Sequence, residues 1–398
     1  MLLLRRSRTL AAAAAPLAAS LSHRASHAEP QREEATVVGA VVLFRHGARS
    51  PIFHLPDGPS ASYETITKAP TGALSVRVNN GNGCHRSFPS GAPGCLTDLG
   101  WAQAEALGRR LRRRYGGAVQ VSATHSTDTS RTVLTAHAVL TGLNPSAPAS
   151  IDVIRGAPLA IDIGCAELAA HMEAGRAAHR ATDAANRRTR AEIEANFGEA
   201  YVPGSCGLLA VHDDCVARHV HGHGPSPSVD LALCEQASRE TAREVRAALR
   251  HSLDSTVGGG AVSNAFAARL AAGQLLELIA SHISECRASP PSSDAPRLLL
   301  LSAHDTSLLA VLNALEHTSD PEELKAPDDG VWPPHTSCIA FELLSDGRVR
   351  VTYQWEEMVT QPVETFLRAT KRVAATAAQH ARICGESGSD GSAFHWAD

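Results

Sequence analysis

Arg45, His46 and Arg49 lie within five residues near the amino end of the chain, in the segment Arg45-His46-Gly47-Ala48-Arg49-Ser50-Pro51. Guanidinium groups pair with phosphate oxygens, and a neutral imidazole nitrogen can attack phosphorus. Gly47 allows the main chain to approach a neighbour closely. The alternative is a surface loop that pairs with acids, but so long a pattern rarely recurs by chance. The segment predicts a site for a phosphate group.

A second segment, Ser302–Thr306, contains His304 and Asp305 and follows the apolar run Leu298–Leu301. A neutral carboxyl group at Asp305 could protonate a leaving alcohol oxygen, and His304 could hold phosphoryl oxygens. Taken alone, Asp305 is more typical of an ordinary N-cap of a helix. The presence of the first segment favours the chemical role.

A third polar segment, Ala123–Thr132, contains His125 and also follows a predicted strand. The three predicted strands cover residues 36–44, 119–123 and 297–302. Ligands of α/β proteins collect where the carboxyl ends of such strands meet. The three segments are therefore expected to converge on one edge of a sheet.

With these motifs the chain resembles the histidine acid phosphatases of the histidine phosphatase superfamily (branch 2), and within them the lysophosphatidic acid phosphatase type. The resemblance spans about residues 37–360 and is strongest in the two end motifs. It implies a phosphomonoesterase in which His46 becomes a phosphohistidine and Asp305 protonates the leaving group. Arg45, Arg49 and His304 would bind the phosphate, without any metal or cofactor. It also implies a disulfide between Cys165 and Cys384.

The third segment departs from the family pattern. His125 stands where the family commonly has an arginine, immediately before Ser126-Thr127-Asp128. If His125 binds phosphate in its place, binding should weaken above about pH 6.5, where an unperturbed imidazole loses its charge. A catalytically weak pseudophosphatase that binds anionic ligands is therefore an alternative, as are a phytase and a phosphoglycerate-mutase-like transferase. The substrate is expected to be a small-molecule or lipid phosphate monoester.

The predicted elements indicate an α/β fold: a mixed, mostly parallel sheet flanked by helices, with a mostly helical cap inserted in the middle of the chain. The core is expected at 36–160 and 290–398 and the cap at 161–289. A loop is expected at 55–93, and Asp346-Gly347 predicts a hairpin between strands 338–344 and 348–354. Helices are predicted at the following residues: 98–115 after an N-cap at Thr97, 128–140, 165–196, 230–252, 261–285, 306–316 and 361–383.

Composition excludes several classes of protein. The 398 residues are 43% hydrophobic and 20% charged with a net charge of −4, which argues against a disordered chain and against nucleic-acid binding. No apolar run is long enough to predict a transmembrane segment. Residues 1–28 contain four arginines and no acid, which is typical of a targeting segment. A mitochondrial destination is favoured, with the secretory pathway (secreted or lysosomal) as the alternative.

Overall fold

The computed structural model describes residues 35–53, 55–56, 61–66, 74–78, 93–116, 119–162, 164–202, 207–251, 265–289 and 295–385. The expected targeting segment at 1–28 lies outside these residues. So do Cys84 and Cys206. Among the described helices, none combines the length and the apolar character needed to cross a bilayer.

A mixed sheet of eight strands lies at the centre, in the order β2-β4-β3-β5-β1-β6-β7-β8. The strands from β2 to β1 run parallel, and β6, β7 and β8 are antiparallel to their neighbours. This confirms the predicted mixed, mostly parallel sheet. The strand bounds are β1 (Val37–Arg45), β2 (Leu74–Val78), β3 (Gln120–Thr127), β4 (Ala149–Ile154), β5 (Arg297–Ala303), β6 (Cys338–Leu344), β7 (Arg348–Tyr353) and β8 (Glu356–Pro362).

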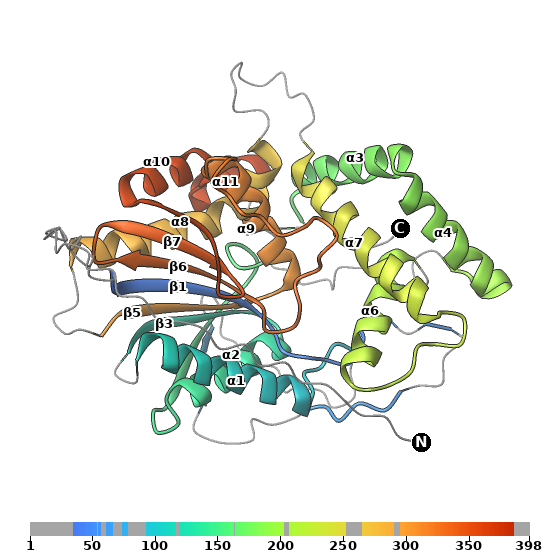
Figure 1. Ribbon diagram of the computed structural model, residues 1–398, viewed down its shortest axis with the longest axis horizontal. Coiled ribbons are helices and arrows are strands. Elements are labelled where there is room, and N and C mark those ends of the chain that lie inside the picture. Colours follow the sequence, from blue (N-terminus) through green and yellow to red (C-terminus); the bar gives the residue numbers. More distant parts are fainter. Residues whose placement is uncertain are drawn as a thin grey trace, which may run out of the picture. The chain divides into compact units, whose positions relative to one another are not determined.

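Helices cover both faces of the sheet. Figure 1 shows α1 (Asp98–Tyr115) and α2 (Ser130–Leu143) on one face, and α8 (Phe266–Ala288), α9 (Asp305–Thr318) and α10 (Val363–Val373) on the other. Strand β1 supplies both cores, because Val41 and Leu43 pack toward α8 and α9 whereas Val42 and Phe44 pack toward α1. An unbroken apolar run is what a strand buried on both faces requires. Thr97 caps α1 as predicted, since its side chain accepts a hydrogen bond from the amide of Gly100.

A helical cap follows β4 in the chain and lies beside the sheet layer (Figure 1). Its helices are α3 (Ala166–Thr182), α4 (Ala184–Phe197), η1 (Gly198–Ala200), α6 (Leu208–Val220) and α7 (Leu231–Arg250). It has a core of its own, in which Ile193 and Phe197 pack with Val211 and Leu233. Helix α8 lies within the range 161–289 expected for the cap, but it is buried against β1 and β6.

Two disulfide bonds fasten the cap. Cys165 is joined to Cys384 at the end of α11 (Ala377–Cys384), which confirms the predicted pairing. Cys215 is joined to Cys234, which links α6 to α7 and was not predicted.

Several elements differ from the prediction. Strand β2 lies inside the segment expected to be a loop, and it pairs with β4 at the end of the sheet. The helix expected over 165–196 is divided at Asp183, whose side chain caps α4. The helix expected over 361–383 is divided into α10 and α11 by Ala374 and Ala375. Strands β4 and β8 and helix α6 were not predicted.

Candidate active site

Strand β1 places the first motif at the carboxyl edge of the sheet. Arg45 ends β1, and the amide of His46 donates a 3.1 Å hydrogen bond to the carbonyl of Ala303 at the end of β5. The turn then packs against α1 so closely that a Cβ atom on Gly47 would collide with the carbonyl of Gly100. Glycine is therefore required at position 47, and this contact helps to hold His46 between the two strand ends.

The protonation of His46 follows from its neighbours. Its Nδ1 atom lies 2.8 Å from the carbonyl oxygen of Gly47. Because a carbonyl only accepts hydrogen bonds, Nδ1 carries the proton and Nε2 keeps its lone pair. Burial lowers the pKa of His46 well below its usual value, and three nearby arginines lower it further; these are Arg131, Arg45 and Arg49. The ring is therefore neutral and its Nε2 can act as a nucleophile.

His304 lies beside His46, with 5.7 Å between the ring centroids. Its Nε2 is 3.0 Å from Thr127 Oγ1 at the end of β3, and its Nδ1 is 3.5 Å from Nη2 of Arg131. A guanidinium only donates hydrogen bonds, so Nδ1 of His304 is the acceptor. Burial and then Arg131 lower the pKa of His304 to about 3. The ends of β1, β3 and β5 thus meet at one place, as the three segments predict.

Arg45 and Arg49 are buried beside these rings. Arg45 donates to the carbonyl of Pro333 at 2.6 Å, and Arg49 donates to that of Ser50 at 3.0 Å. Each also keeps a buried Nε atom without a hydrogen-bond partner among the described residues. Buried donors need acceptors, and the oxygens of a bound phosphate would supply them.

Arg131 is a third arginine of this cluster, and sequence reasoning missed it. It lies in the first turn of α2, four residues after the end of β3, and its Nε is likewise buried without a partner among the described residues. Burial and then the repulsion of Arg49 lower the pKa of Arg131 to about 10. The signal that could have identified it is a basic residue at the start of the helix that follows a converging strand.

Asp305 is ionised here, although the sequence analysis expected a neutral acid. Its Oδ2 is 2.7 Å from Nη2 of Arg45 and 3.0 Å from the indole nitrogen of Trp332, and its Oδ1 accepts a hydrogen bond from the amide of Thr306. Burial alone would raise the pKa of Asp305, but Arg45 and the other nearby cations outweigh burial and lower it to about 2. If Asp305 protonates a leaving group, it must therefore gain that proton when substrate binds.

The cap contributes Asp213, which sequence reasoning did not assign to the site. Its Oδ1 is 2.5 Å from Nη2 of Arg49, and its Oδ2 accepts from the amides of Ile52 and Phe53 at 2.5 and 3.2 Å. Both side chains of the ion pair are only 8% exposed. Helix α6 thereby fixes both the guanidinium of Arg49 and the main chain that follows it.

Two more histidine rings, His335 and His212, lie close to the side chains of this site. The ring of His335 lies 5.8 Å from that of His46, and His212 of α6 lies 4.8 Å from Trp332. Burial lowers the pKa of His335 well below its usual value and that of His212 to about 4. Both rings are therefore neutral, so the positive charge at this site comes from the arginines.

The described contacts of His125 are with β4 and β2, which argues against its predicted role in binding phosphate. Its Nδ1 is 3.9 Å from Oδ2 of Asp152, its register partner on β4. Burial lowers the pKa of His125, and the charged groups that act on it are Asp152 and Arg77. Arg77 and Asp152 also form an ion pair with each other, since Arg77 Nε lies 2.6 Å from Asp152 Oδ1. The expected loss of phosphate binding above pH 6.5 therefore has no basis in His125.

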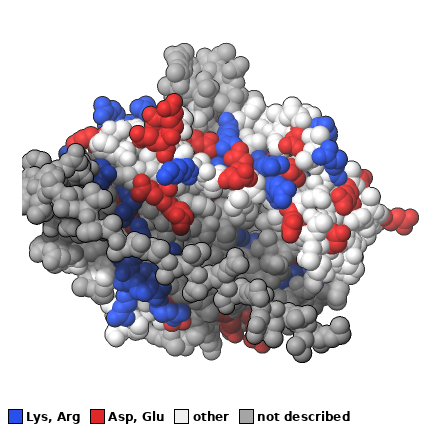
Figure 2. Space-filling view, in the orientation of Figure 1, with Lys and Arg blue, Asp and Glu red and all other residues white. Residues whose placement is uncertain are grey.

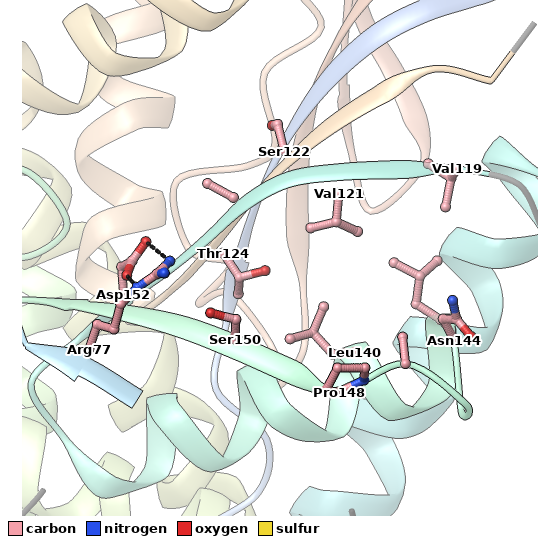
Figure 3. Close-up of a pocket in the computed structure, with 13 residues that line it drawn as sticks. Arg77, Val119, Val121, Ser122, Thr124, Leu140, Asn144, Pro148, Ser150 and Asp152 are labelled. Carbon is pink, nitrogen blue, oxygen red and sulfur yellow. Dashed lines mark hydrogen bonds and ion pairs between the residues drawn. The ribbon is translucent and has the colours of Figure 1, made fainter. Parts of the chain in front are cut away.

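Asp152 also lines a cavity of about 320 Å³ between β3 and β4. Figure 3 shows its ion pair with Arg77 at one end of this cavity and Asn144 toward the other, with Thr124 and Ser150 between them. The lining contains neither His46 nor Asp305. This cavity is therefore distinct from the histidine and arginine cluster.

The described side chains on the face drawn in Figure 2 carry charges of both signs. Basic and acidic side chains are interspersed there, apart from a group of basic side chains at the lower left. Within the described site, the positive charge available to a phosphate group is that of the three buried arginines.

The sequence is similar to proteins of known family. The family model of the histidine phosphatase superfamily (branch 2) matches residues 36–195. Human testicular acid phosphatase is 27% identical over 329 residues, which are 78% of this chain and 68% of that protein.

Two solved phytases share the fold. The phytase of Klebsiella sp. ASR1 superimposes with a TM-score of 0.56 at 14% identity, over 87% of this chain and 99% of its own. The Hafnia alvei phytase in complex with tartrate superimposes with a TM-score of 0.54 at 13% identity, over 87% of this chain and 98% of the phytase chain. The family match over residues 36–195 and the acid phosphatase relative therefore relate this chain to branch 2 of the histidine phosphatase superfamily and to its phosphoric monoester hydrolases.

Proposed function

We propose that this chain hydrolyses phosphate monoesters through a phosphohistidine formed on Nε2 of His46. The observation that carries the proposal is a neutral, buried imidazole with a free Nε2 among three arginines. Arg45, Arg49 and Arg131 bind the phosphoryl oxygens and stabilise the charge that develops on them in the transition state. For His304 to bind the same oxygens, its Nε2–H would have to leave Thr127 Oγ1 and donate to the phosphate instead.

The reaction has two steps that differ in the role of Asp305. In the first, Nε2 of His46 attacks phosphorus, the bond from phosphorus to the alcohol oxygen breaks, and Asp305 donates a proton to that oxygen. In the second, Asp305 accepts a proton from water while the water oxygen attacks the phosphohistidine. The bond from phosphorus to Nε2 breaks, Asp305 passes its proton to the phosphate, and inorganic phosphate leaves, so that His46 and the carboxylate of Asp305 are restored. The indole of Trp332, 3.0 Å from the carboxylate, keeps Asp305 oriented in both steps.

The proton of the first step arrives with the substrate. The free enzyme holds Asp305 as a carboxylate because its pKa is lowered to about 2, whereas a phosphate monoester keeps one proton up to about pH 6. A bound phosphate also neutralises the arginines that lower the pKa of Asp305, so the proton can move to the carboxylate. We expect kcat/KM to fall about tenfold per pH unit above about pH 6.

This expectation is checked by pH profiles for two monoesters with different second pKa values, such as p-nitrophenyl phosphate and glycerol phosphate. The midpoint of the fall in kcat/KM should move with the pKa of the substrate. An identical midpoint for both substrates would assign the titration to the enzyme instead.

We place lysophosphatidate first among the candidate substrates, on the strength of the sequence motifs shared with the lysophosphatidic acid phosphatase type. We also place the protein in an oxidising compartment, because disulfides persist there. The pairs Cys165–Cys384 and Cys215–Cys234 favour the secretory alternative over a reducing mitochondrial matrix.

The decisive experiment is the release of p-nitrophenol by the wild type, by His46→Ala and by the control His125→Ala. His46→Ala should lose at least about 10⁴-fold in kcat, because the nucleophile is absent. The control should keep its activity, because His125 contacts Asp152. Equal turnover by the wild type and His46→Ala would refute the mechanism, and no turnover by the wild type would favour the pseudophosphatase. A phosphate-release panel with lysophosphatidate, phytate, sugar phosphates and phosphotyrosine then ranks the substrates.

A further inference from the structure

A group of metal-binding side chains lies in the cap, where the turn between α3 and α4 meets α7. His179 lies in the last turn of α3, Asp183 is the N-cap of α4, and Glu240 is on α7. One ligand atom from each residue lies within 4.8 Å of the other two. Figure 1 shows α3, α4 and α7 next to one another in the cap, and α3 and α4 both contact α7.

Two of these side chains have buried atoms that need a partner. The carboxylate of Glu240 is only 4% exposed, and its Oε2 has no hydrogen-bond partner among the described residues. Nε2 of His179 is also buried and lacks such a partner within the described part of the chain. Leaving a buried carboxylate oxygen and an imidazole nitrogen unsatisfied is unfavourable. A single ligand that contacts both atoms would satisfy them.

The remaining contacts orient the three side chains. Oδ1 of Asp183 accepts hydrogen bonds from the amides of Ala185 and Asn186, while its Oδ2 lies 3.9 Å from Nε2 of His179. Oε1 of Glu240 accepts a 3.1 Å hydrogen bond from Arg243. One oxygen of each carboxylate is thus already bound, and the other oxygen remains for a ligand.

We propose that His179, Asp183 and Glu240 form a binding site for a divalent transition-metal ion of the zinc type, separate from the active site. One imidazole nitrogen with two carboxylates suits Zn²⁺, whereas Ca²⁺ and Mg²⁺ take oxygen ligands almost alone. Bonds of about 2.0–2.2 Å hold tetrahedral ligands about 3.3 Å apart, so the ligand atoms, which lie within 4.8 Å of one another, must approach by up to about 1.5 Å. Water would fill the fourth position.

A second group of suitable residues does not serve as a site. Asp162, His380 and Cys384 also lie within ligand distance of one another. The sulfur of Cys384 is bonded to Cys165, so it cannot act as a thiolate ligand.

An ion at His179, Asp183 and Glu240 would join the α3–α4 turn to α7. Helix α7 packs against α6, which carries Asp213. The ion would therefore stabilise the cap without entering the reaction, and phosphatase activity gives a readout of correct folding that is independent of metal binding.

The test is calorimetric titration of the EDTA-treated full chain with ZnCl₂, for the wild type, His179→Ala and Glu240→Gln. The matched control is His219→Ala, because His219 is an exposed histidine on α6. We expect a tight site in the wild type and the control, and a Kd raised about 100-fold or more in the two ligand variants. Glu240→Gln keeps the shape of the side chain, so it still tests the site if His179→Ala fails to fold.

Titration with CoCl₂ gives a second readout, since the visible absorption of bound Co²⁺ reports its ligands. The Co²⁺ bands should be present in the wild type and lost in His179→Ala while both proteins hydrolyse p-nitrophenyl phosphate equally. Equal Zn²⁺ affinity of the wild type and both ligand variants would mean adventitious binding at other histidines and would overturn the proposal. The absence of any tight site in the wild type would overturn it as well.

Discussion

The two sides of the active site are built in different ways. On the sheet side, His46, His304 and Asp305 immediately follow the buried strands β1 and β5, so the sheet positions them directly. On the cap side, Asp213 reaches Arg49 across a sequence separation of 164 residues, from a helix whose place depends on its own small core. The difference indicates that the strand ends carry the groups that react, whereas the cap orients Arg49 beside them.

Asp305→Asn tests the sheet side and should have the largest effect of the three substitutions that follow. The amide cannot donate or accept the proton, so kcat should fall by about 10³-fold for an alkyl phosphate. p-Nitrophenolate leaves more readily without a proton, so the loss in its release should be smaller when phosphorylation of His46 limits the rate. Single-turnover rates for both substrates make this comparison. Equal losses for the two leaving groups would mean that Asp305 only positions Arg45, 2.7 Å away.

Arg131→Ala tests which residue completes the sheet side, and His125→Ala is its matched partner. Charge-assisted hydrogen bonds from Arg131 to phosphate should contribute enough that kcat/KM falls by about 10²-fold when they are lost. His125→Ala should change kcat/KM by less than about twofold, since charge-assisted contacts with phosphate are not lost there. The inhibition constant for inorganic phosphate provides a second measurement. The opposite ranking of the two variants would restore the role that the sequence assigned to His125.

Most site residues on the sheet side could be predicted from the sequence, whereas the residue on the cap side could not. Five of the residues could be identified because each is close in sequence to the end of an apolar strand, so no knowledge of distant contacts was needed. These are Arg45, His46, Arg49, His304 and Asp305. Arg131 was missed because it lies on α2, where exposure of a helical arginine to solvent is the usual outcome. Asp213 has no local signal, since its role depends on how the cap packs.

The elements of the fold could be predicted where their burial leaves a recognisable pattern of apolar residues in the sequence. The continuous apolar runs of β1 and β5 predict strands, and the Asp346-Gly347 turn predicts the β6–β7 hairpin, which the structure confirms. β2 and β4 alternate polar with apolar residues over only five and six positions, which is too little to distinguish a strand from a loop. The place of α8 on the sheet was missed because an apolar helix can cover a sheet or another helix equally well.

Asp213→Asn tests the cap side and should have the smallest effect on catalysis. The amide keeps the shape of the side chain but leaves the buried charge of Arg49 without its partner, so the free energy of unfolding should fall by about 3 kcal/mol. kcat/KM should fall by roughly tenfold, mainly through KM, because Arg49 loses its orientation while His46 and Asp305 stay in place. Asp214→Asn is the matched control: Asp214 is also buried on α6, but its Oδ2 pairs with Arg218 at 2.7 Å. This control should lose stability yet keep kcat/KM within about twofold, since its partner Arg218 lies on the same helix. A similar fall in kcat/KM for both variants would show that general loosening of the cap, and not the contact with Arg49, links the cap to catalysis.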